Sequence, residues 1–153
     1  MSVDAAEPCF LDTNILVYAM GETGTPKADL ARALVMQSVG SGALRTSAQV
    51  LQELYVTLTR KSAFRMAPEQ ALPFIDEIAR NPVVAPEYQQ IREAILLSAR
   101  ASLSFWDALI LVAAANSGAK RLYSEDLQHG QEILGVSVVN PFLALTSASA
   151  PKE

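Results

Sequence analysis

Short apolar stretches alternate with helical patterns along most of the chain, and this alternation restricts the possible folds more than any other feature. The apolar stretches predict strands at Cys9–Leu11, 43–45, 83–84, 119–124 and 135–140. Apolar spacing and cap residues predict helices at 15–19, 26–39, 68–81, 87–100 and 104–117, and one from a cap at Thr46 or Ser47 to Leu58. Strands that alternate with helices typically form a parallel sheet covered on both faces. The sequence therefore predicts an α/β fold whose ligands bind at the carboxyl ends of the strands.

The composition indicates one globular domain. Of the 153 residues, 50% are hydrophobic and 18% are charged, so the chain is neither disordered nor fibrous. We expect a single domain over residues 1–145 and a disordered tail over residues 146–153, which read TSASAPKE. The apolar fraction is high for a small domain, which favours an oligomer or a partner that covers part of the surface.

The net charge of −4 argues against a protein that binds duplex nucleic acid by phosphate neutralisation alone. Any contact with nucleic acid must depend on a local basic patch or on metal ions. The densest patch is Arg60, Lys61 and Arg65, although three such charges are more typical of a solvated face.

Several features favour a cytoplasmic protein with no membrane segment. Cys9 is the only cysteine, so the chain forms no internal disulfide, as expected in a reducing compartment. The first residues, MSVDAAEP, are acidic and lack the basic region of a signal peptide. The longest apolar run, 108–115, is too short to span a bilayer.

Four acids are expected at the same edge of the sheet. Asp12 ends the first strand, and Asp126 follows the strand that contains RLY. Asp107 lies in the first turn of its helix and Glu53 in the second turn of another. Each has a simpler explanation: Asp12, Asp107 and Asp126 suit helix or turn caps, and Glu53 suits a solvated helix edge. Independent caps, however, have no reason to share one edge.

Clustered carboxylates repel one another and raise each other's pKa unless a cation lies among them. Oxygen ligands of this kind suit Mg²⁺ or Mn²⁺, which retain several waters and take other ligands from phosphate. Such an ion lowers the pKa of a bound water and neutralises charge on a phosphodiester. The acids therefore predict metal-dependent hydrolysis of a phosphodiester bond, and the ions would let an acidic protein hold a polyanion.

Five segments, in order, carry a resemblance to a known family: FLDTNILVYA at 10–19, QVLQELY at 49–55, SFWDALIL at 104–111, LYSEDLQHG at 122–130 and VVNPF at 138–142. They resemble PIN domains and, more narrowly, the VapC-type ribonuclease toxins of prokaryotic toxin–antitoxin pairs. The resemblance implies a three-layer α/β/α sandwich with a parallel sheet of about five strands. It also implies Mg²⁺- or Mn²⁺-dependent endonucleolytic cleavage of RNA, with tRNA and ribosomal RNA as substrates to test. The implied partners are a cognate antitoxin, whose peptide lies across the acidic groove, and a second copy of the chain in a homodimer.

The resemblance assigns roles to the four acids, which match the family's catalytic quartet. Asp12 and Asp107 would be the main direct metal ligands. Glu53 and Asp126 would bind the metal through water or orient the nucleophile. Glu125 is a rival to Asp126 that the sequence leaves open.

Three further polar residues match the family pattern. Thr13 and Asn14 follow the first acid, where Asn14 would hold Asp12 or the metal shell by hydrogen bonds. Ser124 is the hydroxyl residue two before the last acid.

Three other residues are less informative. His129 is the only histidine and suits a structural role near a turn. Trp106 could stack on a base, but packing in the core is the simpler explanation. Ser104 lacks the partnered base that a nucleophile needs.

Two other classes of function stay open at this point. One is a non-catalytic module of the same fold that binds RNA or protein. The other is a phosphoacceptor or phosphatase-like α/β domain with Asp12 as nucleophile. It is disfavoured because Asn14 stands where a second acid is usual and Lys120 begins its strand rather than ending it.

Overall fold

The computed structural model describes residues 6–21, 24–61 and 63–148 of the chain. In chain order the elements are β1 (Cys9–Leu11), α1 (Thr13–Ala19), α2 (Pro26–Gly40), β2 (Leu44–Ser47), α3 (Ala48–Arg60), α4 (Pro68–Ala79), β3 (Val83–Val84), α5 (Tyr88–Ala101), α6 (Phe105–Asn116), β4 (Arg121–Tyr123), β5 (Glu132–Ile133), β6 (Val136–Val139) and α7 (Leu143–Ala148). Every predicted strand and helix is confirmed, with ends that differ by a few residues. The sequence analysis did not predict β5 or α7.

The strands form one sheet in the order β3-β2-β1-β4-β6-β5. All neighbours pair in parallel except β5, which is antiparallel to β6. The predicted parallel sheet of about five strands is therefore confirmed, and the two-residue β5 extends it at one edge.

The chain changes direction across the sheet at β1. It runs outward from β1 to β2 and β3, then returns to place β4 on the other side of β1. In open α/β sheets, ligands bind where the strand order reverses in this way, at the carboxyl ends of the two strands. Leu11 pairs with Tyr123 in the last register position, and the Asp12 N–H donates to the Tyr123 carbonyl at 3.0 Å. The residues after β1 and β4 therefore emerge side by side.

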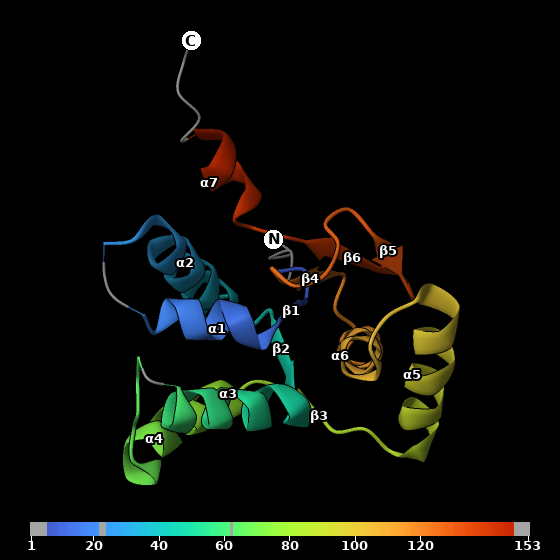
Figure 1. Ribbon diagram of the computed structural model, residues 1–153, viewed down its shortest axis with the longest axis horizontal. Helices are drawn as coiled ribbons and strands as arrows, with labels where there is room; N and C mark the ends of the chain where they lie inside the picture. The colour runs from blue at the N-terminus through green and yellow to red at the C-terminus, as the bar shows by residue number, and fades with distance from the viewer. Residues whose placement is uncertain (1–5, 22–23, 62, 149–153) are drawn as a thin grey trace, which may run out of the picture.

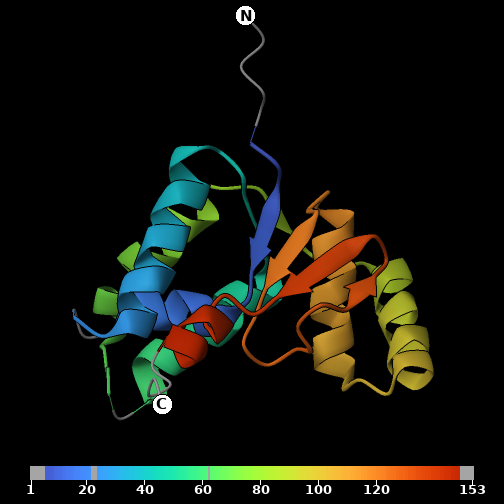
Figure 2. The same cartoon turned by 90° about the horizontal axis from the view of Figure 1, so that it is seen from above.

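The helices form two layers around the sheet. Figures 1 and 2 show α1, α2, α3 and α4 on one side of the strands and α5 and α6 on the other. This arrangement is the predicted three-layer α/β/α sandwich.

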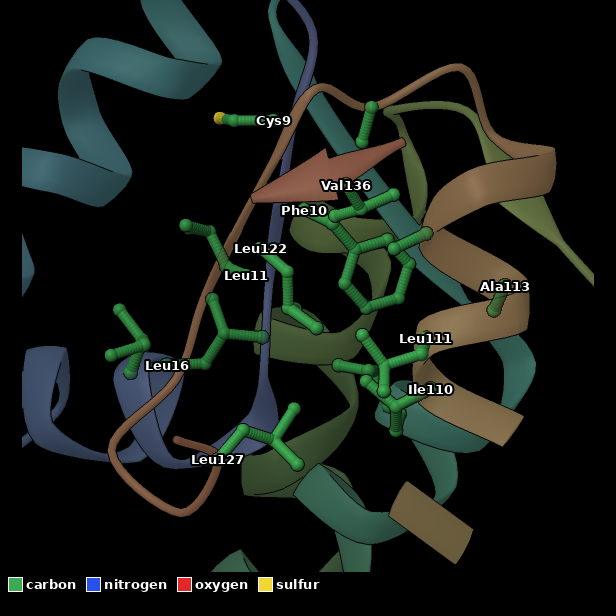
Figure 3. Close-up of a cluster of buried hydrophobic side chains, with 14 of the residues drawn as sticks. Cys9, Phe10, Leu11, Leu16, Ile110, Leu111, Ala113, Leu122, Leu127 and Val136 are labelled. Atoms are coloured by element: carbon green, nitrogen blue, oxygen red, sulfur yellow. The ribbon is translucent and has the colours of Figure 1, made fainter. Parts of the chain in front are cut away.

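Side chains of β1 alternate between the two layers (Figure 3). Phe10 points toward Leu111 of α6, while the Cys9 thiol donates to the Ser38 hydroxyl of α2 at 3.4 Å. Phe10 and Leu11 have no exposed surface, and Cys9 is 7% exposed. A strand buried on both faces is typical of a parallel sheet. The interpretation of Cys9 as a small buried residue is confirmed.

Hydroxyl caps fix the starts of the helices that carry the predicted acids. Ser47 is the N-cap of α3, and its Oγ accepts a hydrogen bond from the Val50 N–H at 3.3 Å. Ser104 caps α6 in the same way. At the other end of α6, Gly118 has a φ of 80°, a left-handed conformation that suits glycine and ends the helix.

The end of the domain differs in part from the prediction. The tail was expected to begin at Thr146, but α7 continues to Ala148, so residues 146–148 belong to a helix. Residues 149–153 lie outside the described part of the chain. In the described part, no single helix is both long and apolar enough to cross a membrane; only α5 and α6 taken together, bent by 120° between them, meet that measure.

Candidate active site

Asp12 directly follows β1 and lies at the point where the strand order reverses. It is the N-cap of α1, and its Oδ1 accepts a hydrogen bond from the Thr13 N–H at 2.8 Å. Only 8% of its surface is exposed. The capping explanation for Asp12 is therefore confirmed, but this role uses one carboxylate oxygen and leaves Oδ2 for other partners.

Residues from α1 and from the end of β4 surround that second oxygen. The Ser124 hydroxyl donates to Asp12 Oδ2 at 2.7 Å, and the Asn14 side-chain amide approaches it at 3.5 Å. The same amide donates to Asp126 Oδ2 at 3.1 Å, and the Asp126 N–H donates to Ser124 Oγ at 3.1 Å. We call Asp12, Asn14, Ser124 and Asp126 the β1–β4 cluster.

Glu53 of α3 joins this cluster through Thr13. The Thr13 hydroxyl donates to Glu53 Oε2 at 2.9 Å. The other carboxylate oxygen, Oε1, accepts a hydrogen bond from Gln49 Nε2 at 2.8 Å. Gln49 Nε2 also donates to the Trp106 carbonyl of α6 at 3.3 Å. Hydrogen bonds therefore run without a break from Asp126 to the first turn of α6.

Gln49 was not proposed as a site residue by the sequence analysis. It is 7% exposed, and in the described part of the chain its Oε1 is buried without a hydrogen-bond partner. Its position one helical turn before Glu53 was the available signal, because residues four apart on a helix are neighbours. The contact with α6, 57 residues away, was not readable from the sequence.

Asp107 is the predicted acid that the structure does not bring into contact with the others. Its N–H donates to Ser104 Oγ at 3.1 Å, but in the part of the chain that is described its carboxylate makes no hydrogen bond or ion pair. Within the described residues, the link from Asp107 to the site runs through the neighbouring carbonyl of Trp106, which accepts a hydrogen bond from Gln49.

The electrostatics of Asp12 are unusual for a carboxylate. Burial, and to a smaller extent the charges of Glu53 and Asp126, raise the pKa of Asp12 from the ordinary 3.8 to about 6. Hydrogen bonds from Ser124 and from the Thr13 N–H oppose this rise and lower the pKa. A cation beside Asp12 would remove the electrostatic penalty.

The side chains of the site offer carboxylate, hydroxyl and amide oxygens, which are the ligand types that a hard divalent cation prefers. Among the described residues, no three of the His, Cys, Asp and Glu side chains lie close enough to hold a metal ion by themselves. Mg²⁺ usually retains several waters and is bound through one or two carboxylates. The arrangement therefore fits an ion held by few protein ligands, with Asp12 as the buried one.

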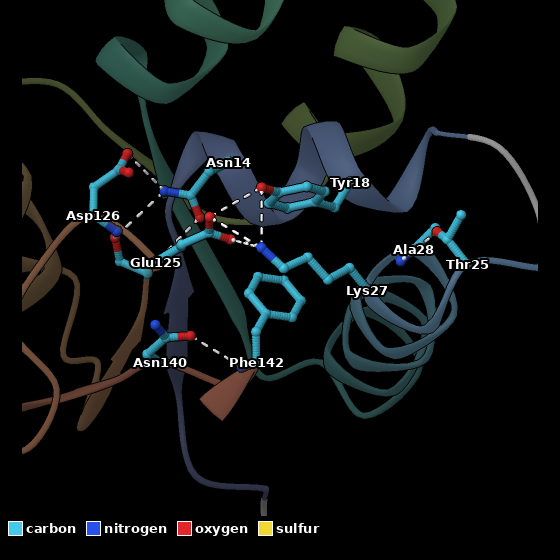
Figure 4. Close-up of polar contacts among 10 residues, drawn as sticks. Asn14, Tyr18, Thr25, Lys27, Ala28, Glu125, Asp126, Asn140 and Phe142 are labelled. Atoms are coloured by element: carbon cyan, nitrogen blue, oxygen red, sulfur yellow. Dashed lines mark hydrogen bonds and ion pairs between the residues drawn. The ribbon is translucent and has the colours of Figure 1, made fainter. Parts of the chain in front are cut away.

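Glu125 and Asp126, which the sequence left as rivals, face different partners. Glu125 accepts hydrogen bonds from Tyr18 and Lys27, whereas Asp126 accepts one from Asn14 (Figure 4). The geometry favours Asp126 as the fourth acid.

A groove of about 660 Å³ opens beside the candidate active site. Glu53 and Asp126 lie in its lining, together with apolar side chains of α1 and α3 such as Val17 and Val56. Lys61, which follows α3 as its C-cap, adds a positive charge to the lining. One residue of the predicted basic patch therefore lines the same groove as Glu53 and Asp126.

Two minor interpretations have opposite outcomes. The structural role of His129 is confirmed, because its Nδ1 accepts a hydrogen bond from the Asn140 N–H at 3.0 Å. The core position preferred for Trp106 is wrong: Trp106 is 62% exposed and contacts Phe105 edge to face, at 5.1 Å between ring centres. The first turn of α6 points its indole outward because the buried face of the helix begins at Ala108.

Comparisons with known proteins address the family and the fold of the chain. Residues 9–131 match the PIN domain family. Ribonuclease VapC13 of Mycobacterium tuberculosis is 32% identical over 119 residues, which cover 76% of this chain and 88% of that protein.

Solved structures support the fold. A toxin–antitoxin complex from Klebsiella pneumoniae is similar at a TM-score of 0.63 and 18% identity, over 87% of this chain and 97% of that chain. VapC20 of Mycobacterium tuberculosis, described as a toxin that cleaves the sarcin–ricin loop, has a TM-score of 0.58 and 21% identity, over 77% of this chain and 91% of that chain. The predicted α/β sandwich is thus confirmed by proteins of known structure.

Proposed function

The chain belongs to the PIN domain family and, within it, to the VapC ribonucleases, and from this premise we propose that it is an endoribonuclease that depends on Mg²⁺ or Mn²⁺. The observation that carries the proposal is the position of Asp12. It is buried at the carboxyl end of the central strand, at the point where strand order reverses, with a pKa raised to about 6 by burial and by two neighbouring carboxylates. Strongly shifted pKa values cluster at functional sites, and a bound cation would offset the repulsion among these carboxylates.

In this proposal the four acids have different roles. Asp12 and Asp107 would be direct metal ligands, and Asp126 and Glu53 would bind the metal through water or orient the attacking water. A bound Mg²⁺ or Mn²⁺ supplies a water of lowered pKa and neutralises the charge that builds on the phosphodiester.

The polar residues around the acids keep them in place. Asn14 and Ser124 hold Asp12 and Asp126 by the hydrogen bonds of the β1–β4 cluster. Thr13 holds Glu53 in the same way. Side chains that orient metal ligands by hydrogen bonds commonly tune the affinity of the site.

The substrate would be single-stranded or looped RNA in the groove beside Lys61. Base stacking on an exposed aromatic ring and backbone contact with a lysine are typical of such binding. Trp106, exposed beside Asp107, offers the ring, and Lys61 offers the charge. Because the net charge of the chain is −4, these local contacts and the metal must offset the overall repulsion of RNA.

The proposed partners follow the family. A cognate antitoxin would inhibit the enzyme by placing a peptide across the acidic groove, and two copies of the chain would form a homodimer. The proposed location is the cytoplasm, where its RNA substrates, tRNA or ribosomal RNA, are found.

The direct test is RNA cleavage by the chain purified free of any partner. The panel contains tRNA, ribosomal RNA fragments and a sarcin–ricin loop RNA, each with Mg²⁺, with Mn²⁺ and with EDTA. We expect discrete cuts that require metal and disappear in Asp107→Asn. Asp76→Asn, an exposed acid on α4, is the control and should cleave normally. Cuts that persist in EDTA or in Asp107→Asn would contradict the proposal.

One observation favours a second candidate, a non-catalytic module of the same fold that binds RNA or protein. In the described part of the chain the acids do not form a ready three-ligand site, and Asp107 stands apart. Calorimetric titration with Mn²⁺ separates the two, because a non-catalytic module has no requirement for divalent ions. Binding that is lost in Asp12→Asn supports the ribonuclease, and no binding supports the module.

A further inference from the structure

The two adjacent acids after β4 point in opposite directions (Figure 4). Lys27 Nζ lies 3.1 Å from Glu125 Oε2 and 3.2 Å from Oε1, and the Tyr18 hydroxyl donates to Oε1 at 3.0 Å. Asp126 instead accepts a hydrogen bond from the Asn14 amide at 3.1 Å. Which of the two acids faces the site therefore depends on what holds Glu125.

Lys27 is well placed to hold it. Its ammonium group lies 5.0 Å from the centre of the Tyr18 ring and 5.3 Å from that of Phe142, and the two rings meet edge to face at 5.1 Å. Aromatic faces around a cation restrict where it rests. Lys27 comes from α2 and Phe142 from the segment after β6, so residues from opposite ends of the chain fix one carboxylate.

Stability alone explains this ion pair poorly. The side chains of Lys27 and Glu125 are 45% and 29% exposed, and ion pairs this open to solvent contribute little to folding. The position of the pair, directly beside the acidic site, suggests an effect on the geometry of that site instead.

The backbone of Glu125 connects the pair to the site. The Glu125 N–H donates to Asn14 Oδ1 at 3.3 Å, while the amide nitrogen of the same Asn14 donates to Asp126. The Asn14 side chain therefore contacts two successive residues of the loop after β4: its oxygen binds the Glu125 N–H and its nitrogen binds Asp126. If Glu125 turned toward the site, its carboxylate would approach those of Asp12, Glu53 and Asp126. Neighbouring negative charges repel one another.

We propose that Lys27 and Tyr18 are positioning residues that hold the Glu125 carboxylate away from the acidic site and so place Asp126, rather than Glu125, against Asn14 as the fourth acid. This inference rests on the proposed function, since it assigns the fourth acid of that site. If Lys27 serves to keep the charged Glu125 carboxylate out of the site, then a variant with a neutral residue 125 should no longer need Lys27 for cleavage.

The kinetic test uses that dependence. With an RNA that the wild-type chain cleaves, Lys27→Met should lower kcat about tenfold with KM changed less than threefold, and Lys27→Arg should retain most of kcat. Glu125→Gln alone should retain at least half of kcat, because its amide oxygen still accepts from Lys27 and Tyr18. The double variant Lys27→Met/Glu125→Gln should recover to within threefold of wild type. A double variant as slow as Lys27→Met would overturn the proposal, as would an unchanged kcat in Lys27→Met.

A second readout does not depend on cleavage. The Asn14 side-chain amide gives a pair of ¹H–¹⁵N resonances, identified by their loss in Asn14→Asp. They should shift in Lys27→Met and in Tyr18→Phe, and return toward wild type when Glu125→Gln is added. Resonances that stay fixed in both single variants would overturn the proposal, and this holds even if Lys27→Met alone proves unstable. If wild type cleaves no RNA but the resonances shift and return, the proposed function fails while the positioning role stands.

Discussion

The two sides of the candidate active site are built in different ways. Where β1 and β4 end, Asp12 and Asp126 are tied by Asn14 and Ser124 into the β1–β4 cluster, and Asp12 is almost fully buried. At the start of α6, Asp107 stands beside an exposed Trp106 and, among the described residues, only its backbone N–H is hydrogen-bonded. The difference indicates that folding organises one side, with an electrostatic penalty, whereas on the other side the Asp107 carboxylate stays available for the proposed ion.

The largest effects should come from removing one acid on each side. We expect Asp12→Asn and Asp107→Asn each to lower RNA cleavage on the order of 1000-fold, since each removes a proposed ligand of the metal. Stability should separate them. In EDTA at neutral pH, Asp12→Asn should melt at a higher temperature than wild type, because a buried charge is removed. Asp107→Asn should melt as wild type does. Equal melting temperatures for all three proteins would contradict the contrast between the two sides.

The pH dependence of stability sharpens the same contrast. The folded protein keeps a proton on Asp12 up to about pH 6, while the unfolded chain releases it near 3.8, so the folded state binds more protons in this window. The stability that this proton contributes is fully present below pH 3.8 and is lost as pH rises through about 6, and the loss between pH 4 and pH 7 is about 2 kcal/mol. Asp12→Asn lacks this group.

The measurement is urea unfolding in EDTA across that range. The free energy of unfolding of Asp12→Asn minus that of wild type should grow by about 2 kcal/mol from pH 4 to pH 7. Gln89→Leu, at an exposed position of α5 that carries no ionisable group, is the control and should give a constant difference. A constant difference for Asp12→Asn would show that burial does not perturb Asp12.

The organised side was also the more predictable one. Asp12 could be placed from the sequence because it follows a short apolar strand, and parallel strands end at one edge of a sheet. The choice between Glu125 and Asp126 could not, since it depends on Lys27, which is 98 residues away. Trp106 was misplaced because an aromatic residue in an apolar helix is usually buried. Gln49 was missed because its partner on α6 is a backbone carbonyl, which leaves no pattern in the sequence.

On the open side, Trp106→Ala tests contact with substrate. If the exposed indole stacks on a base, its removal should raise KM about tenfold, within the ~1–3 kcal/mol that one stacked base contributes. We expect kcat and the melting temperature to change little, because Trp106 is 62% exposed and contacts Phe105 alone among the described aromatic rings. Trp106→Phe retains an aromatic face and should restore most of the affinity. An unchanged KM in Trp106→Ala would place substrate elsewhere.

Gln49 connects the two sides, and the variant Gln49→Leu should have the smallest effect. The change removes two hydrogen bonds, to Glu53 at 2.8 Å and to the Trp106 carbonyl at 3.3 Å, but it also removes a buried Oε1 without a partner in the described part of the chain. An unsatisfied buried acceptor costs about 1–3 kcal/mol, so the two contributions should nearly cancel and leave stability within about 1 kcal/mol of wild type.

Thr13 still holds Glu53, so kcat of Gln49→Leu should fall only about fivefold, as expected of a residue that aligns groups without touching substrate. Gln89→Leu, at an exposed position of α5, is the matched control. A loss of stability without a loss of kcat would mean that Gln49 supports the fold and that the two sides of the site are aligned by other contacts.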